Sequence, residues 1–295
     1  MYKFKIIFSG LSKNCLESTK KNVYSIIELR KNYKDLDVEF YIVDSDSNDG
    51  TKEYLFEISK QLDFIKFFNL DGLEEKFNSR IERIAECRNI CIQQIQKTST
   101  SKELLYIPMD LDINLFEITD IEKFYLIMEN FTSQKNIDAL FPVSEPFYYD
   151  IFALRAKGWI NFNSQLIVNS LKRFFLIGSF FINYLFIFRY QWSSKKISRK
   201  DISIISAFGG MGIYKIYQDK VKQLKYITSE KNTDYVSEHI SFNKNFENLK
   251  MDINWKIPAP SEHVMYKALQ PTKKINYFLK TVKSDLKNNL FNFFK

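Results

Sequence analysis

Strand and helix patterns alternate over the first 110 residues of this 295-residue chain. The first apolar, strand-like run breaks at Ser9-Gly10, and apolar residues then recur at helical spacing. Strand patterns follow at 37–43, 64–69 and 104–109, and helical patterns at 52–62 and 80–96. Such alternation is typical of parallel strands joined by crossover helices. We therefore predict an α/β fold with a mostly parallel central sheet flanked by helices.

Two carboxylates come directly after the strand pattern at 104–109. Asp110 and Asp112 are one residue apart, and on an extended strand residues i and i+2 share a face. Ligands collect at the carboxyl ends of strands in open α/β sheets, and oxygen ligands suit Mg²⁺ and Mn²⁺ equally. The pair is a candidate site for a divalent cation held against phosphate oxygens. The alternative is a solvated turn, which is the commoner context of an isolated Asp-x-Asp.

The polar segment at 44–51, Asp-Ser-Asp-Ser-Asn-Asp-Gly-Thr, resembles a segment of nucleotide-sugar glycosyltransferases with the GT-A fold. In that family the first Asp contacts the base; this chain departs from the usual Asp-Asp-Gly at Ser45-Asp46. Arg88-Asn89, on the predicted helix before Asp110, resembles the family's Arg-Asn dipeptide. The resemblance implies a nucleotide-sugar-binding set and a metal pair. The first set comprises Ser9, Asp44, Asp46, Arg88 and Asp110, and the second comprises Asp110 and Asp112.

Three later blocks, at 148–155, 206–214 and 237–243, resemble bacterial glycosyltransferases that are distantly similar to the fungal capsule-associated (CAP59-like) mannosyltransferases. The middle block holds three of the chain's eight glycines, so its backbone either bends in a tight turn or approaches a ligand closely. The resemblance favours the ligand and implies an acceptor side. The expected acceptor-side residues are Asp150, Arg155, Gly209, Gly210 and His239.

Both histidines of the chain follow a glutamate, in Glu238-His239 and Glu262-His263. Histidines this sparse suggest a metal site, and the alternative is a histidine satisfied in the core or at the surface. By order along the chain, the resemblance implies that Glu238 is the catalytic carboxylate that accepts the acceptor's proton. It implies that His263 is a metal ligand, with His239 as the alternative in that role.

Together these features predict a metal-dependent glycosyltransferase that moves a sugar from a nucleotide-sugar donor to a glycan or lipid-linked acceptor in bacterial surface polysaccharide synthesis. Mn²⁺ or Mg²⁺ would act as a Lewis acid on the leaving diphosphate. Two other classes stay open: a non-catalytic protein that binds glycans or nucleotide sugars at a membrane surface, and a nucleotidyltransferase. The spacing of the residues does not decide between inversion and retention at the anomeric carbon.

Two segments are unusually apolar for their position. Residues 174–188 carry no charge but are shorter than the roughly 20 residues that cross a bilayer, so they form either a buried helix or an interfacial segment. Apolar residues from Ile275 to Leu290 lie at helical spacing among lysines, which predicts a basic amphipathic helix suited to an anionic membrane surface. The alternative for this helix is packing on the main domain, with a solvated lysine face.

We expect one GT-A-type domain over 1–265 and a basic tail over 266–295. Within the domain, 1–115 would form the nucleotide-sugar-binding half and 116–265 the acceptor-side half. No secretory pattern opens the chain and its three cysteines form no disulfide framework, so we expect a cytoplasmic protein, peripheral at the cytoplasmic face of the membrane. The net charge of +8 comes from scattered lysines without a recognition motif, so no nucleic-acid partner is expected.

Overall fold

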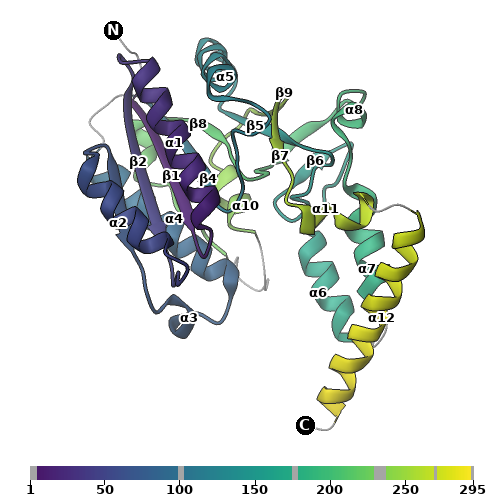
Figure 1. Ribbon diagram of the computed structural model, residues 1–295. Helices are drawn as coiled ribbons and strands as arrows, with labels where there is room; N and C mark the ends of the chain where they lie inside the picture. Colours follow the sequence, from purple (N-terminus) through teal and green to yellow (C-terminus); the bar gives the residue numbers. More distant parts are fainter. Residues whose placement is uncertain (1–4, 99–102, 175–178, 229–236, 269–270, 294–295) are drawn as a thin grey trace.

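A nine-stranded sheet forms the centre of the molecule in the computed structural model, which describes residues 5–98, 103–174, 179–228, 237–268 and 271–293 (Figure 1). The strand order is β3-β2-β1-β4-β8-β5-β9-β7-β6. The strands are β1 (Lys5–Ser12), β2 (Asp37–Asp44), β3 (Ile65–Asn69), β4 (Glu103–Asp110), β5 (Ala139–Glu145), β6 (Arg155–Lys157), β7 (Ser203–Ser206), β8 (Ile213–Tyr217) and β9 (Leu249–Pro258).

Helices cover both faces of this sheet. The longer ones are α1 (Leu16–Asn32), α2 (Thr51–Gln61), α4 (Arg80–Thr98), α5 (Ile121–Ser133), α6 (Ser164–Phe174), α7 (Ser179–Phe186), α11 (Ser261–Ala268) and α12 (Pro271–Phe293). The shorter ones are α3 (Leu73–Lys76), the 3-10 helix η1 (Phe188–Tyr190), α8 (Ser194–Ile197), α9 (Gln218–Val221) and α10 (Glu238–Asn243). The prediction of an α/β fold with a large sheet flanked by helices is confirmed.

The strands β3, β2, β1 and β4 are all parallel, as the alternating pattern predicts. Beyond β4 the sheet becomes mixed, because β8 runs antiparallel to both β4 and β5. The parallel pairings remain the longer ones, and β5 pairs in parallel with β9 over Ala139–Glu145. One continuous sheet therefore joins the two halves that are expected on either side of residue 115.

Two hydrophobic cores lie on opposite faces of the sheet, because successive side chains of a strand point to opposite faces. Apolar residues of α1, α2 and α5 pack against Ile6 and Phe8 of β1. Apolar residues of α4 and α10 pack on the other face, against Ile7 and Tyr106. Strands covered on both faces read as continuous apolar runs, which is why β1 and β4 show little polar alternation.

The register of the parallel strands brings polar residues to one edge of the sheet. Ser12 at the end of β1 pairs with Asp44 at the end of β2, and Leu11 pairs with Asp110 at the end of β4. Asp44 and Asp110 therefore lie on either side of the end of β1. Their position at the carboxyl ends of the strands is where open α/β sheets bind ligands.

The helices α6, α7 and α12 project from the sheet as one group, which we call the helical extension (Figure 1). The rings of Phe180 on α7 and Phe278 on α12 lie 5.1 Å apart, edge to face. Residues 175–178 of the uncharged run fall outside the described residues; of its α7 part, Ile182 is buried while Phe181 and Leu185 are exposed. Among the described residues, no helix is long and apolar enough to cross a membrane.

Candidate active site

Asp44 is fully buried and fastens the loop after β2 to the end of β1. Its Oδ2 accepts hydrogen bonds from Ser12 Oγ (2.8 Å) and Ser47 Oγ (2.6 Å), and its Oδ1 accepts from the Ser47 N–H (3.2 Å). Burial raises the pKa of Asp44, although these hydrogen bonds act in the opposite direction. In this structure Asp44 therefore holds the shape of the loop after β2.

Asp46 takes the left-handed backbone conformation (φ 60°) and reaches across to the start of α3. Its carboxylate accepts hydrogen bonds from the N–H groups of Gly72 and Glu74. Desolvation opposes ionisation, but the hydrogen bonds outweigh it and lower the pKa of Asp46. Asp46 thus joins the loop after β2 to the loop after β3.

Ser9, a predicted nucleotide-sugar contact, lies inside the core rather than at the sheet edge. It is fully buried, and its Oγ accepts a hydrogen bond from the hydroxyl of Tyr106 at 3.4 Å. The side chain points to the α4 face of the sheet, where burial and neighbouring Cys91 raise the pKa of Tyr106 to about 12. The structure therefore places Ser9 in the packing between β1 and β4, away from the carboxyl ends of the strands.

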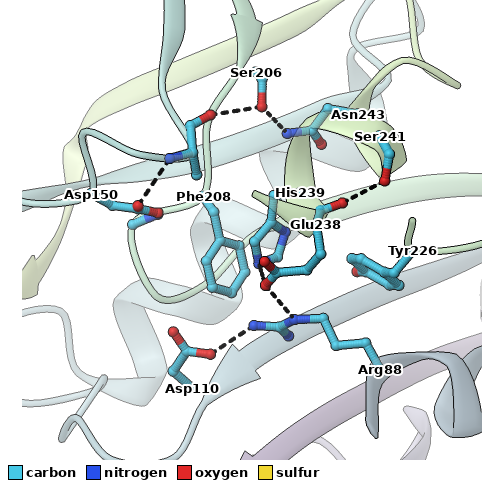
Figure 2. Close-up of polar contacts among 12 residues, drawn as sticks. Arg88, Asp110, Asp150, Ser206, Phe208, Tyr226, Glu238, His239, Ser241 and Asn243 are labelled. Atoms are coloured by element: carbon cyan, nitrogen blue, oxygen red, sulfur yellow. Dashed lines mark hydrogen bonds and ion pairs between the residues drawn. The ribbon is translucent and has the colours of Figure 1, made fainter. Parts of the chain in front are cut away.

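Arg88 of α4 joins two carboxylates that are far apart in the sequence (Figure 2). Its Nη2 donates to Asp110 Oδ1 at 2.7 Å, and its Nε donates to Glu238 Oε1 at 3.3 Å. The Arg88 side chain is 1% exposed, that of Glu238 9% and that of Asp110 32%. Because desolvation is outweighed by these two negative charges, the pKa of Arg88 is raised and the guanidinium stays charged.

Aromatic rings enclose the Arg88 guanidinium. Its carbon lies 4.8 Å from the ring centre of Phe208 and 5.7 Å from that of Tyr226. His239 stacks on Phe208 with ring centres 3.6 Å apart and is 2% exposed. Burial, followed by the nearby Arg88 charge, lowers the pKa of His239 well below its usual value, so this imidazole is neutral.

Three buried nitrogens around this cluster have no hydrogen-bond partner among the described residues: Arg88 Nη1, His239 Nδ1 and His239 Nε2. His239 Nε2 lies 3.4 Å from Glu238 Oε1 but makes no hydrogen bond with it. Native interiors leave few buried polar atoms unpaired, and those that remain mark strain or a place for a ligand. The cluster thus has unused hydrogen-bonding capacity beside Asp110.

The glycine pair forms a tight turn against the end of β4. Gly209 and Gly210 have φ angles of 74° and 99°, which side chains rarely adopt. The carbonyl of Gly210 accepts a hydrogen bond from the Asp110 N–H at 2.8 Å, and a Cβ on Gly210 would lie 2.9 Å from the Tyr149 hydroxyl. Asp150 Oδ2 accepts from the Gly209 N–H at 3.0 Å. The glycines therefore allow this turn to lie directly beside the Asp-x-Asp.

Asp150 and Arg155 are both largely engaged with backbone groups. Asp150 also accepts a hydrogen bond from the Ala153 N–H at 3.2 Å, and burial raises its pKa. Arg155 Nη1 donates to the carbonyls of Phe152 (3.1 Å) and Leu154 (2.6 Å), and burial lowers its pKa to about 10. These two residues hold the 150–155 turn on which the glycine pair rests.

Asp112 is exposed at the edge of this cluster. Its carboxyl group is crowded by protein, and this desolvation, followed by the negative charge of Asp110, raises its pKa to about 6. Two neighbouring carboxylates that repel each other are stabilised when a cation binds between them. The donor set is hard oxygen, which fits Mg²⁺ or Mn²⁺.

The predicted third ligand, His263 of α11, lies exposed above Tyr149, with ring centres 5.5 Å apart. Desolvation is the largest influence on the pKa of His263 and lowers it, whereas the charges of Glu262 and Asp110 oppose that effect. No three of His, Cys, Asp and Glu among the described residues lie close enough to hold an ion together. The structure brings His263 to the same side as Asp110 without completing a ligand set.

Several residues of the cluster are absent from the set predicted by sequence. Phe208 immediately precedes the glycine pair, and its apolar character gives no sign that it stacks on His239. Tyr226 is held by Asn89, whose side chain donates to the Tyr226 carbonyl (2.9 Å) and accepts from its N–H (2.8 Å). The position of Asn89 directly after Arg88 is the available signal. The hydrogen bonds between Asn89 and the Tyr226 backbone join distant parts of the chain, so only the tertiary structure reveals them.

Comparison with known proteins finds similarity among solved structures. A scan against protein-family models found no match, and a search of curated proteins found none. Solved structures with partial similarity include S. aureus TarS 1–349 in complex with UDP-GlcNAc, with a TM-score of 0.45, 12% identity, and coverage of 96% of this chain and 66% of that chain. The mannosyltransferase PcManGT from Pyrobaculum calidifontis in complex with GDP-Man and Mn²⁺ has a TM-score of 0.36 and 15% identity. The match covers 50% of this chain and 37% of that chain.

Mannosyl-3-phosphoglycerate synthase from Rubrobacter xylanophilus is also similar, with a TM-score of 0.39, 9% identity, and coverage of 98% of this chain and 74% of that chain. The chain spans less than two thirds of the TarS fragment and of PcManGT. Likenesses at these identities and TM-scores do not establish a shared activity. The resemblance of the blocks at 148–155, 206–214 and 237–243 to bacterial glycosyltransferases therefore stays a prediction.

Proposed function

We propose that this protein is a metal-dependent glycosyltransferase of GT-A type, which transfers a sugar from a nucleotide sugar to a glycan or lipid-linked acceptor. The observation that carries the proposal is the charged chain Asp110–Arg88–Glu238 at the carboxyl end of the central strand β4. It joins the carboxylate suited to a donor-bound cation to the carboxylate suited to the acceptor. Asp112 stands beside it on the solvent side.

Asp110 and Asp112 would hold the divalent cation, and substrate phosphates and water would supply the remaining ligands. The bound cation would supply Lewis-acid stabilisation of the charge that develops on the diphosphate. Arg88 fixes the Asp110 carboxylate through its 2.7 Å hydrogen bond, so this oxygen does not turn away from the site. His263 remains our candidate for a further ligand, and it reaches that role only if α11 moves closer to Asp110.

Glu238 is our candidate general base, for a reaction that inverts the anomeric carbon. Burial raises its pKa, which makes its carboxylate a stronger base, while Arg88 lowers the pKa and keeps the group ionised. A carboxylate has two acceptor oxygens, so Glu238 can take a proton from an acceptor hydroxyl while its Oε1 keeps the 3.3 Å contact with Arg88 Nε. The buried His239 beside it offers neutral nitrogens for a sugar hydroxyl.

The acceptor would approach from the side of the glycine pair, Asp150 and His239. We propose bacterial surface polysaccharide synthesis as its setting and the cytoplasmic face of a membrane as its location, because nucleotide sugars are made in the cytoplasm. Asp150 and Arg155 act here as positioning residues, since their side chains hold the 150–155 turn under Gly209. Asp44 and Asp46 shape the donor loop in the same indirect way.

A second candidate is a non-catalytic protein that binds nucleotide sugars or glycans. The observation that favours it is the 9% exposure of the Glu238 side chain and its ion pair with Arg88, which bury the proposed base and neutralise its charge. Such a protein would bind a donor but leave it intact. A nucleotidyltransferase would instead release pyrophosphate from a nucleoside triphosphate.

The test is a screen of the purified chain against UDP-, GDP-, CMP- and dTDP-sugars, each with Mn²⁺ or with EDTA. Ligands that bind the native state raise the unfolding temperature, so thermal shift reports the donor, and chromatography reports nucleotide release. We expect one metal-dependent donor whose stabilisation is lost in Asp112→Asn and retained in Asp35→Asn, an exposed carboxylate outside the site. Glu238→Gln should keep donor binding and lower kcat about 10²–10⁴-fold.

Each outcome separates the candidates. The non-catalytic protein is supported if a donor binds without transfer to mixed glycan or lipid-extract acceptors and Glu238→Gln leaves the slow nucleotide release unchanged. Pyrophosphate release from nucleoside triphosphates supports a nucleotidyltransferase. Failure of every donor to stabilise folded protein would contradict the glycosyltransferase proposal.

A further inference from the structure

Lysines and arginines are scattered along the whole chain, but their excess over Asp and Glu is confined to two separate ranges of it. Residues 151–200 contain nine Lys or Arg and no Asp or Glu, and residues 266–295 contain seven Lys and one Asp. The rest of the chain has 27 Lys or Arg against 34 Asp or Glu, so it is net negative. The overall charge of +8 therefore combines two strongly basic ranges with a mildly acidic remainder of the chain.

The fold packs α7 of the first range, which lies beside α6, against α12 of the second range in the helical extension, whereas β6 and α8 of the first range lie at the sheet (Figure 1). Phe180 of α7 packs on both Phe278 and Tyr277 of α12, with ring centres 5.1 Å and 6.4 Å apart. The single acidic side chain of α12, Asp285, accepts a hydrogen bond from the Ser179 N–H at the start of α7 (3.2 Å). Since Asp285 is used in this packing, the lysines of α12 dominate the outer charge of the extension.

The extension also exposes large apolar side chains that packing leaves uncovered. On α7, Phe181 and Leu185 are 57% and 45% exposed; on α12, Ile275 and Leu279 are 63% and 56% exposed. Each pair has i, i+4 spacing and so shares one side of its helix. Phe278 joins the two pairs, because its ring lies 5.8 Å from that of Phe181 and it is one turn from Ile275. Lys273, Lys280 and Lys283 are exposed on the same helix α12.

We propose that this face of the helical extension binds the surface of an anionic phospholipid bilayer, with its apolar side chains at the acyl boundary and its lysines at the headgroups. Apolar burial combined with lysine–headgroup attraction is the chemistry of interfacial helices. The proposal goes beyond sugar transfer and does not depend on it. A second copy of the chain is a poorer occupant, because it would bring two strongly basic faces together.

Nucleic acid would also attract the lysines but would leave the exposed phenylalanine, leucines and isoleucine without apolar contact. A bilayer satisfies both features at once. Each lysine close to an anionic membrane surface contributes about 1 kcal/mol to the binding free energy, so a few lysines suffice for salt-sensitive attachment. The face combines side chains of α7 and α12, which are about 100 positions apart in the sequence. The C-terminal helix by itself supplies only part of this face.

The experiment is co-sedimentation of the purified full chain with vesicles of phosphatidylcholine alone or with about one third phosphatidylglycerol, at low and physiological salt. We expect sedimentation with the anionic vesicles only, weakened by salt. Lys280→Glu/Lys283→Glu should reduce the partition coefficient about tenfold or more. Leu279→Ser should reduce it severalfold, because apolar burial is lost.

Matched controls exist on the sheet body, by which we mean the central sheet and all helices other than α6, α7 and α12. Leu126 on α5 is 59% exposed, close to the 56% of Leu279, so Leu126→Ser removes a similar side chain elsewhere. Lys31→Glu/Lys34→Glu changes the net charge by the same amount at exposed positions around the end of α1. Both controls should bind anionic vesicles as the unaltered chain does. All variants are exposed substitutions, and circular dichroism confirms that each is folded.

The proposal is overturned if the folded, unaltered chain does not sediment with anionic vesicles. It is also overturned if the control pair reduces binding as much as Lys280→Glu/Lys283→Glu, because the effect would then be net charge alone. Sedimentation velocity tests the remaining occupant. A dimer that Leu279→Ser dissociates, without vesicle binding by the unaltered chain, would assign this face to a second copy.

Discussion

The sheet body and the helical extension differ in whether their charged side chains are buried and paired or exposed and unpaired by opposite charges. In the body, Arg88 is 1% exposed and its charge is matched by Asp110 and Glu238, which come from other elements. In the extension, Lys273, Lys280 and Lys283 of α12 are exposed without an acidic partner among the described ion pairs, and large exposed apolar side chains lie on the same helix. A buried charge that loses its partner destabilises the fold, so substitutions in the candidate site are expected to lower the stability of the sheet body as well. The face of the extension can change without unfolding the protein.

The largest effect is expected for Arg88→Met. Removing the guanidinium leaves Asp110 and Glu238 without their shared cation in a buried place, which should cost about 3–5 kcal/mol of unfolding free energy. Urea denaturation at pH 7 measures it. Arg30→Met is the matched control, because Arg30 pairs with Asp63 at the surface and should change stability by no more than about 1 kcal/mol. Equal effects at both sites would contradict the contrast between buried and exposed charge.

The next effect concerns the turn beside Asp110. Gly210→Ala places a Cβ at a φ of 99° and 2.9 Å from the Tyr149 hydroxyl, so we expect a loss of about 2–3 kcal/mol. Gly72→Ala isolates the backbone part, because Gly72 has a φ of 86° and its new Cβ would meet no atom within 4 Å beyond its chain neighbours. That control should lose about 1 kcal/mol. Thermal or urea unfolding compares them, and equal losses would show that crowding at Gly210 is unimportant.

A smaller effect of opposite sign is expected at Asp112. Its folded pKa of about 6 lies above the ordinary value of 3.8, so the unfolded chain ionises first as pH rises and native stability falls between about pH 4 and pH 6. In EDTA, Asp112→Asn should therefore be more stable than the unaltered chain above pH 6, by less than about 1 kcal/mol because the group is exposed.

Urea unfolding at several pH values measures this difference, which should disappear near pH 4. The matched control, Asp35→Asn, should show no such change with pH. If Mn²⁺ binds at this position, its addition should stabilise the unaltered chain and leave Asp112→Asn unaffected. An Asp112→Asn protein that is less stable at pH 8 in EDTA would contradict the assigned repulsion between Asp110 and Asp112.

The smallest effect is expected in the extension. Ile275 is 63% exposed, so Ile275→Ser should change the unfolding free energy by no more than about 0.5 kcal/mol. Ile26 on α1 is fully buried, and Ile26→Ser should cost more than about 3 kcal/mol. Urea denaturation of both gives the contrast between the two regions. A large loss at Ile275 would mean that this face is covered within the folded protein.

Much of the body is predictable from its local patterns. The alternation of apolar runs and helical spacing over 1–110 predicts β1, β2, β3 and β4 with their crossover helices, and all are observed. The position of Asp110 at the end of β4 follows from the same pattern. The prediction is reliable there because parallel strands buried on both faces must be apolar along their whole length.

The site is only partly predictable. Arg88, Asp110 and Glu238 are each expected from their motifs, yet nothing in the sequence indicates that they form one ion-paired chain across 150 residues. Ser9 and Asp44, expected as ligand contacts, lie buried in hydrogen-bonded packing. A motif reports which side chain is present, whereas its exposure depends on the neighbours that folding supplies.

The sequence by itself determined the α/β class, the parallel first half, the carboxylates at the end of β4 and the basic apolar helix at the C-terminus. These depend on interactions between near neighbours in the chain, namely side-chain periodicity and turn chemistry. The tertiary structure decided the antiparallel insertion of β8, the Arg88 pairing and the joining of α7 to α12. Those depend on contacts between distant segments, whose partners are chosen by packing of the whole chain.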